Sequence, residues 1–318
     1  MNAIKKIGLT ALASSLVVTS AVAGEMSVSG GASIGLKNTT KTASGKSWTM
    51  GNQLTFSGSG ELDNGMNVSL SFVIDQADDS TTGLSKSPFD SHSVTVSSDT
   101  LGTLVFSGEG GGSAQSAIDT TAAGDLWDNG SGFTAPRSSE AGNNSMMYTL
   151  PSIIDDVTVK ASYSPGGAGG SSATSWGIGY TGVEGLSLDY AVGETNTVGS
   201  EQDHSTMKAS YAIGSFTVGY SVTESIYDAS ASTDEEVSSW NVAYTVSDDI
   251  SVSYGTETIE TEGSAIDEEA SKIGVSYTTG GVTLSANSYE FTGKGNSATE
   301  SSTTGDVERW ALSATFAF

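Results

Sequence analysis

Cysteine is absent from the 318-residue chain, and only four prolines occur. The lack of cysteine excludes a disulfide framework and any chemistry that needs a thiol. Apolar residues are also scarce, at 36% of the chain against the roughly 45–50% that is usual in soluble domains. The 12 lysines and arginines stand against 37 acidic residues, which gives a formal charge of −25. Nucleic-acid binding needs a basic surface, so this balance excludes it.

The first 23 residues have the pattern of a secretory signal peptide. Lys5 and Lys6 precede an apolar run over residues 7–18, and a cleavage site of small residues ends at Ala23. The apolar run is too short to cross a bilayer as a helix, which needs about 20 residues. We therefore expect an exported mature domain over residues 24–318.

Apolar and polar residues alternate along the chain in sixteen segments, which is the pattern of β-strands. The last of these segments, residues 308–318, places Trp310, Phe316 and Phe318 on one parity. Seven connections are tight turns rich in Asp, Gly and Asn, which suits hairpins. The eight longer, acidic connections lie near 38–46, 76–90, 109–144, 164–174, 194–204, 223–237, 257–270 and 292–306. This regular order predicts an all-β fold, an antiparallel up-and-down meander of sixteen strands.

Charged side chains fall on the polar parity of the predicted strands, as Lys37, Asp75 and Asp189 illustrate. Parity alone fits both a soluble sandwich and a membrane barrel, which place the apolar face on opposite sides. The even and large strand number, the low apolar content and aromatic residues near strand ends favour a closed transmembrane β-barrel with an aqueous lumen. A signal peptide without a later spanning helix locates such a barrel in the outer membrane.

Four stretches carry a family resemblance that covers nearly the whole mature chain, from residue 24 to the terminal Phe318. They are GEMSVSGGASIGLK at 24–37, ELDNGMNVSLSF at 61–72, GTLVFSG at 102–108 and NSMMYTLPSIIDDVTVKASYSP at 144–165. In this order they resemble the Gram-negative general porins of the sixteen-stranded alphaproteobacterial type.

The resemblance implies a homotrimer that forms a channel for passive diffusion of small hydrophilic solutes. The surroundings it implies are outer-membrane lipid and lipopolysaccharide. Trp310 and Phe316 then belong to the membrane girdle, and the terminal Phe318 resembles the signal that the outer-membrane assembly machinery recognises.

In this family the longest loop, the third, folds inward and constricts the pore. The third long connection here, residues 109–144, is also the longest, and a short helix is expected over 113–127 with Trp127 as its anchor. The candidate acidic residues of the constriction are Glu109, Asp119, Asp125, Asp128 and Glu140. The candidate pore-lining basic residues are Lys160, Lys208, Lys272 and Arg309.

The charge balance of this loop departs from the family pattern. Family constrictions often set acidic loop residues against an arginine cluster on the barrel wall. This chain has only two arginines, and the inward positions of the second to fifth predicted strands are mostly Ser, Thr and Gly. Carboxylates in a low-dielectric wall raise the local concentration of cations. We therefore predict a negative constriction and a preference for cations.

Acidic clusters in the long loops, such as 233–236 and 265–272, carry the oxygen ligands that Ca²⁺ or Mg²⁺ prefers. Their spacing does not match a dedicated calcium site, so a solvated acidic rim is the favoured interpretation and no cofactor is required. The two histidines, His92 and His204, are interpreted as surface residues. Because no Ser–His spacing indicates a hydrolase, the sequence predicts no enzymatic activity.

Two other functions remain open at this point. A substrate-specific porin would carry an aromatic ladder or a track of paired charges in its lumen. A non-conducting adhesin or structural surface protein, built as a β-solenoid, would need a fixed short repeat, whereas the loops here differ widely in length.

Overall fold

The computed structural model describes residues 24–39, 45–75, 89–129, 133, 138–139, 143–166, 170–197, 200–228, 234–296 and 305–318. The predicted signal peptide, residues 1–23, and the candidate residue Glu140 lie outside the described residues. Within those ranges, no helix is long and apolar enough to cross a membrane.

Sixteen strands and one short helical turn make up the described chain. The strands are β1 (Glu25–Thr39), β2 (Gly45–Glu61), β3 (Asn67–Asp75), β4 (Phe89–Ser98), β5 (Gly102–Glu109), β6 (Ser145–Thr149), β7 (Val157–Ser164), β8 (Ser172–Tyr180), β9 (Leu186–Thr197), β10 (Ser200–Ile213), β11 (Phe216–Tyr227), β12 (Glu235–Ser247), β13 (Ile250–Thr261), β14 (Glu268–Thr279), β15 (Val282–Lys294) and β16 (Gly305–Ala317). The turn η1 is a 3₁₀ helix at Leu126–Asn129, between β5 and β6.

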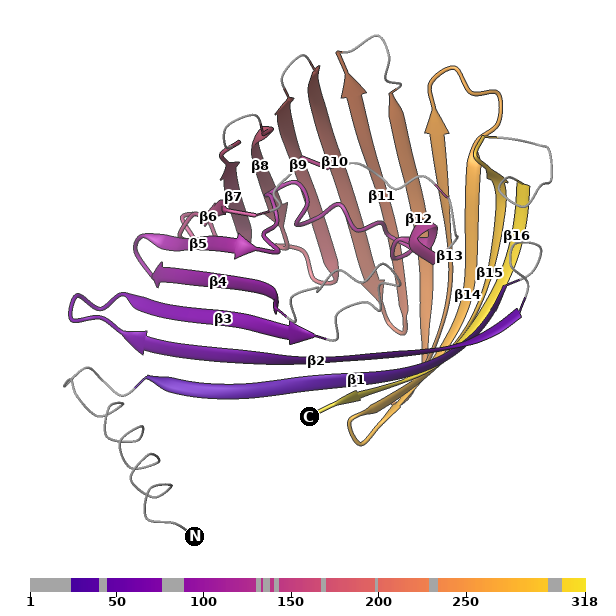
Figure 1. Cartoon of the computed structure of the whole chain (residues 1–318), viewed down its shortest axis with the longest axis horizontal. Helices are drawn as coiled ribbons and strands as arrows, with labels where there is room; N and C mark the ends of the chain where they lie inside the picture. The colour runs from indigo at the N-terminus through magenta and orange to yellow at the C-terminus, as the bar shows by residue number, and fades with distance from the viewer. Residues whose placement is uncertain are drawn as a thin grey trace, which may run out of the picture.

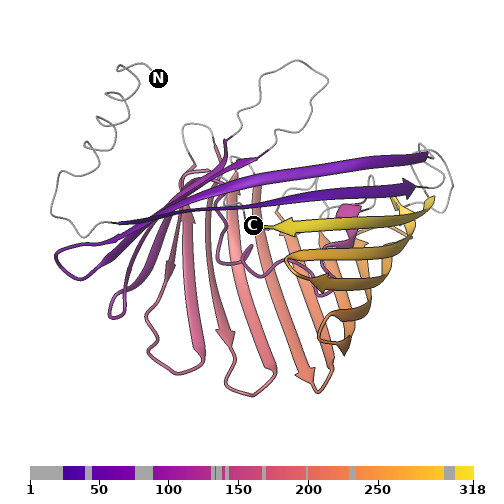
Figure 2. The same cartoon turned by 90° about the horizontal axis from the view of Figure 1, so that it is seen from below.

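The strands form one closed barrel in which every strand pairs with its neighbours in the sequence (Figure 1). The barrel closes where β1 pairs antiparallel with β16, in a register that runs from Gly31 opposite Ala317 to Thr39 opposite Arg309. Figure 2 shows these two strands, indigo and yellow, side by side. The predicted sixteen-stranded up-and-down barrel is confirmed.

The two faces of the wall have opposite chemistry, and the apolar face points outward. Val218, Val275 and Leu284 are each almost half exposed on the outside. The alternate positions point into the barrel, where the described interior includes the buried hydroxyls of Ser221 and Ser239. A soluble protein would bury the apolar face, so this arrangement is that of a barrel surrounded by lipid.

Several strands extend further than the alternation of apolar residues predicts. The connection expected at 194–204 is mostly strand, because β9 continues to Thr197 and β10 begins at Ser200. The connections expected at 223–237 and 257–270 are shortened in the same way. Backbone pairing needs no apolar side chains, so the hydrogen-bonded ladder continues beyond the part of the wall that contacts lipid.

Candidate functional site

The chain that follows β5 enters the barrel and runs along the inside of its wall (Figure 1). Its backbone N–H groups donate hydrogen bonds to serine side chains on four strands of the wall. These bonds are Ala114 to Ser162 on β7 (3.0 Å), Gln115 to Ser175 on β8 (3.3 Å), Ala122 to Ser221 on β11 (2.8 Å) and Ala123 to Ser239 on β12 (2.9 Å). The inward-folded third loop is thus attached to the wall strand by strand, and we call residues 109–144 the constriction loop.

The helix expected over 113–127 is wrong. Only Leu126–Asn129 is helical, as the single turn η1. Backbone donors that a helix would use internally are bound to the wall instead. Asp125, with a φ of 51°, also leaves the helical region just before η1. Leu126, which is fully buried, anchors this turn, whereas Trp127 is only half-buried.

Leu126 belongs to an apolar cluster that lies inside the barrel. Its other buried members are Ala123, Ala270, Tyr289, Phe291 and Val307. Phe133 of the loop packs on Phe291, with ring centroids 4.9 Å apart. The cluster joins the constriction loop to β14, β15 and β16, so the loop is fastened by packing as well as by hydrogen bonds.

Gln115 ties together two parts of the loop and the wall. Its side-chain nitrogen donates to the Thr206 hydroxyl on β10 at 2.9 Å. Its side-chain oxygen accepts from the Ser139 backbone N–H at 2.7 Å. Because Gln115 is fully buried, these bonds are shielded from competition by water.

Glu257 on β13 is the carboxylate that holds the tip of the loop. It accepts hydrogen bonds from the Thr121 hydroxyl and from the Trp127 backbone N–H, the latter at 3.1 Å. Its side chain is 1% exposed. Sequence reasoning missed Glu257 because it assigned residues 257–270 to a connection, whereas β13 continues to Thr261.

Three of the four basic candidates donate to carbonyl oxygens of the constriction loop. Lys208 binds Thr120 at 2.6 Å, Lys272 binds Ala123 at 3.1 Å, and Arg309 binds Asn129 at 2.5 Å. The side chains therefore fasten the loop to β10, β14 and β16. The fourth candidate, Lys160, is half-buried on β7 beneath the start of the loop. The role of all four basic residues as pore-lining charges stays a prediction.

The described acidic candidates have different environments. Asp128 is exposed, and Glu109 ends β5 half-buried. Asp125 accepts a hydrogen bond from the Thr121 backbone N–H at 3.0 Å, which shapes the loop locally. Asp119 is half-buried, and burial raises its pKa above the ordinary value.

Neighbouring groups modify the pKa of Asp119 in both directions. A hydrogen bond from Ser138 and the Lys208 ammonium lower the pKa, while the Asp125 carboxylate raises it. Burial is the largest influence, so the net shift is upward. Asp119 is therefore expected to become neutral at a higher pH than an ordinary aspartate.

The wall that the loop does not touch is almost free of charge at mid-height. Across β1–β5, which are fully described, the inward positions are mostly Ser, Thr and Gly. The inward charged residues lie within two residues of a strand end, and they are Glu25, Lys37, Glu61, Asp75 and Glu109. The constriction therefore has a charged side, built by the loop and its wall, and a neutral hydroxyl-rich side.

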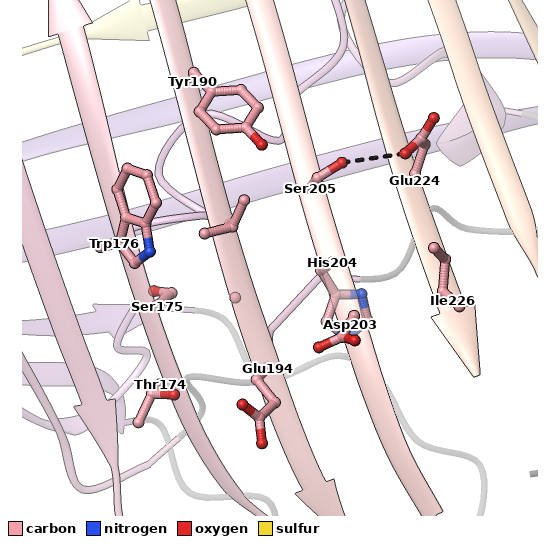
Figure 3. A pocket seen from close by; sticks show the side chains of 12 residues that line it. Thr174, Ser175, Trp176, Tyr190, Glu194, Asp203, His204, Ser205, Glu224 and Ile226 are labelled. Carbon is pink, nitrogen blue, oxygen red and sulfur yellow. Dashed lines mark hydrogen bonds between the residues drawn. The ribbon is translucent and has the colours of Figure 1, made fainter. Parts of the chain in front are cut away.

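The outer face carries its own hollow, of about 550 Å³, across β8–β11 (Figure 3). Trp176 and Tyr190 bound it on one side, and the carboxylates of Glu194, Asp203 and Glu224 lie around it. Among the described residues no group of three or more His, Cys, Asp or Glu side chains is placed to hold a metal ion. The hollow is thus lined by aromatic and acidic side chains together, and a Ca²⁺ or Mg²⁺ site in the acidic loops stays a prediction.

The interpretation of His204 as a surface residue is wrong. His204 is 2% exposed, and its Nδ1 lies 3.0 Å from the Ser225 hydroxyl inside the barrel wall. The position follows from parity, because His204 lies between the outward-facing Asp203 and Ser205 on β10. His92, in contrast, is exposed on β4.

Comparison with solved structures shows the same fold. An outer membrane protein of Vibrio cholerae, the OmpT loop L8 deletion mutant, is 16% identical, with a TM-score of 0.73 over 93% of this chain and 100% of that one. An anion-selective porin from Comamonas acidovorans is 14% identical, with a TM-score of 0.72 and the same coverage. A double mutant of the Rh. blastica porin is 16% identical, with a TM-score of 0.66 over 92% of this chain and 100% of that one.

Comparison of sequences points to the same group of proteins. No curated protein matches the chain significantly. The family model of the Gram-negative porins matches residues 8–256, which is most of the chain. With the closed sixteen-stranded wall and its inward-folded loop, this match shows that the chain belongs to the Gram-negative porin family and is a channel protein of the outer membrane.

Proposed function

We propose that the barrel passes small hydrophilic solutes by passive diffusion and that it prefers cations. The observation that carries this proposal is the asymmetry of the constriction. The loop supplies the carboxylates of Asp119, Asp125 and Asp128, while the facing wall is lined with hydroxyls. Three basic side chains are bound to loop carbonyls and keep their positive charge, so they offset part of the negative charge on the loop side. Hydroxyls and carboxylates together offer a wet path for polar solutes.

A salt gradient across a planar bilayer tests the preference for cations. The reconstituted barrel is expected to conduct, with a reversal potential on the cation side. Two unit charges 4 Å apart in water interact by about 1 kcal/mol, so each carboxylate near the path changes the local cation concentration up to about fivefold. The triple variant D119N/D125N/D128N should therefore move the reversal potential towards zero. An anion-side reversal potential in the unmodified protein would contradict the charge argument while leaving the channel intact.

The raised pKa of Asp119 predicts that selectivity depends on pH. An ordinary aspartate becomes neutral near pH 3.9. Because burial raises the pKa of Asp119, this side chain becomes neutral at a higher pH, and cation preference should begin to fall there. Reversal potentials recorded from pH 7 down to pH 4 measure the effect. The early fall should disappear in D119N and persist in D128N, which leaves Asp119 in place; an early fall that survives in D119N would assign it to another group.

The assembly around the channel is part of the proposal. One of the similar structures is described as a trimer form, which supports a homotrimer here. The highly exposed Trp48 and Met50 of β2 lie beside the exposed Ile34 of β1 and suit contact with another subunit. The remaining outer wall suits contact with outer-membrane lipid and lipopolysaccharide, and the assembly machinery is expected to recognise the C-terminal strand.

A further inference from the structure

A niche of about 130 Å³ lies inside the barrel, between the start of the constriction loop and strands β7, β8 and β9. Its roof is formed by Ala114 and Ile118 of the loop, and Lys160 and Asp189 line it from the wall. We propose that this niche is a binding site for small zwitterions, molecules that carry one ammonium and one carboxylate group. The proposal rests on the channel function proposed above and names a class of solute for it.

The two charged side chains of the niche come from strands that are not neighbours. Lys160 on β7 lies opposite Gly177 of β8, and Asp189 on β9 lies opposite Gly179 of β8. Strands are spaced by about 4.8 Å, so β7 and β9 are about 9.6 Å apart. An ammonium and a carboxylate therefore stand on either side of β8, which presents only glycines between them.

The two charges are not used by the protein itself. Among the described residues, Lys160 and Asp189 form no ion pair with each other or with a third residue. Asp189 accepts one hydrogen bond, from Ser187 at 3.1 Å. Lys208 lies opposite Asp189 in the register of β9 and β10, but its ammonium binds Thr120 of the loop instead. Both charges remain available to a ligand, which is uncommon for charged groups that are half-buried.

The two glycines of β8 keep the floor of the niche open. A Cβ atom at position 179 would lie 2.7 Å from the Asp189 Oδ1 atom, so any larger residue would displace the carboxylate. A Cβ atom at position 177 would lie 3.3 Å from the Ala114 carbonyl oxygen and would push against the loop that forms the roof. The glycines thus allow the carboxylate and the loop to approach the bare backbone of β8.

A zwitterion fits this arrangement better than a single ion does. A cation alone would pair with Asp189 and be repelled by Lys160. An anion alone would pair with Lys160 and be repelled by Asp189. The volume equals that of about four water molecules, so the niche suits a ligand of a few non-hydrogen atoms. The hydroxyls of Thr158 and Thr181 also line the niche and can replace water around polar parts of a ligand. Glycine is the smallest amino acid with both charges and is the probe of choice.

Potassium chloride conductance of the reconstituted barrel, recorded while glycine is added, tests the proposal. A bound zwitterion beneath the loop should obstruct the ion path, so the current is expected to fall and to saturate with glycine concentration. Glycerol, a neutral molecule of similar size, should produce no saturable fall after correction for bulk conductivity. Replacing one of the two charged groups should raise the half-blocking glycine concentration by up to about fivefold, since a partly exposed ion pair is worth up to about 1 kcal/mol.

The variants are Lys160→Met, Asp189→Asn and Gly179→Ala. Matched controls are Lys37→Met and Asp75→Asn, which remove the same charges from inward positions on β1 and β3. The half-blocking glycine concentration of these controls should equal that of the unmodified barrel. Electrophoresis of unheated samples, in which a folded barrel runs as a compact species, shows that each variant has folded.

Two negative outcomes separate the zwitterion site from the channel itself. Normal conductance with no glycine block, or a block that persists in Lys160→Met and Asp189→Asn, would overturn the zwitterion site alone. Absence of conductance in the unmodified, folded barrel would instead overturn the channel function on which the site rests.

Discussion

Replacing Glu257 by alanine is expected to release the tip of the constriction loop and to produce large, noisy single-channel currents. The side chain accepts two hydrogen bonds from the loop, from the Thr121 hydroxyl and the Trp127 backbone N–H. A hydrogen bond to a charged group contributes about 1.5 kcal/mol at the low end, so losing both removes about 3 kcal/mol. Each 1.4 kcal/mol is a factor of ten, so the detached loop becomes roughly a hundred times more populated. Single-channel recording measures both the mean current and its fluctuation.

Two further variants distinguish the possible reasons for such a change. Glu257→Gln keeps an oxygen that accepts from Trp127 and gains an amide that can donate to Thr121, so its currents should stay close to those of the unmodified barrel. Glu260→Ala removes a carboxylate from the same strand, but from the exposed outer face, and should leave the currents unchanged. Quiet, unaltered currents from Glu257→Ala would contradict the assignment of Glu257 as the residue that holds the loop.

The barrel wall was predictable from sequence because a strand encodes its two faces by parity. A slip of one residue would move Val218, Tyr220 and Val222 of β11 from lipid to lumen, so the pattern determines which face points outward. The ends of the strands were not predictable in the same way. Beyond the lipid-contacting belt both faces are polar, and Thr197 and Ser200 carry no signal that distinguishes strand from loop.

The path of the constriction loop was predictable only as an inward fold implied by family resemblance. Its attachment depends on backbone N–H groups, which have no sequence signature, and on serines such as Ser221 and Ser239 that resemble every other lumen serine. Basic residues were placed correctly on the inward face, but whether Lys272 points to open water or to a loop carbonyl depends on that path. The niche between Lys160 and Asp189 required the registers of two successive strand pairs, and the sequence does not encode these in any local motif.

Truncation after Arg309 is expected to prevent formation of the closed barrel. It removes Trp310–Phe318 and with them eight of the nine register pairs that join β16 to β1. The exposed edges of β1 and β15 would then present unpaired backbone groups to lipid, and each such group costs several kcal/mol. Refolding into lipid vesicles, followed by electrophoresis of unheated samples, should show no compact species. A folded band from this truncation would contradict closure through β16.

Removing Phe318 alone separates closure of the barrel from recognition by the assembly machinery. Phe318 exchanges two backbone hydrogen bonds with Gly30, at 2.8 and 3.0 Å, at the end of the β1–β16 seam. All nine register pairs between Gly31 and Thr39 remain without it, so the shortened chain should still fold in vesicles. The Phe318 side chain is 73% exposed and contributes little buried surface, which leaves it accessible to another protein. If the terminal aromatic serves as an assembly signal, the same variant should accumulate poorly in the outer membrane of cells; normal accumulation would show that the closing strand is sufficient.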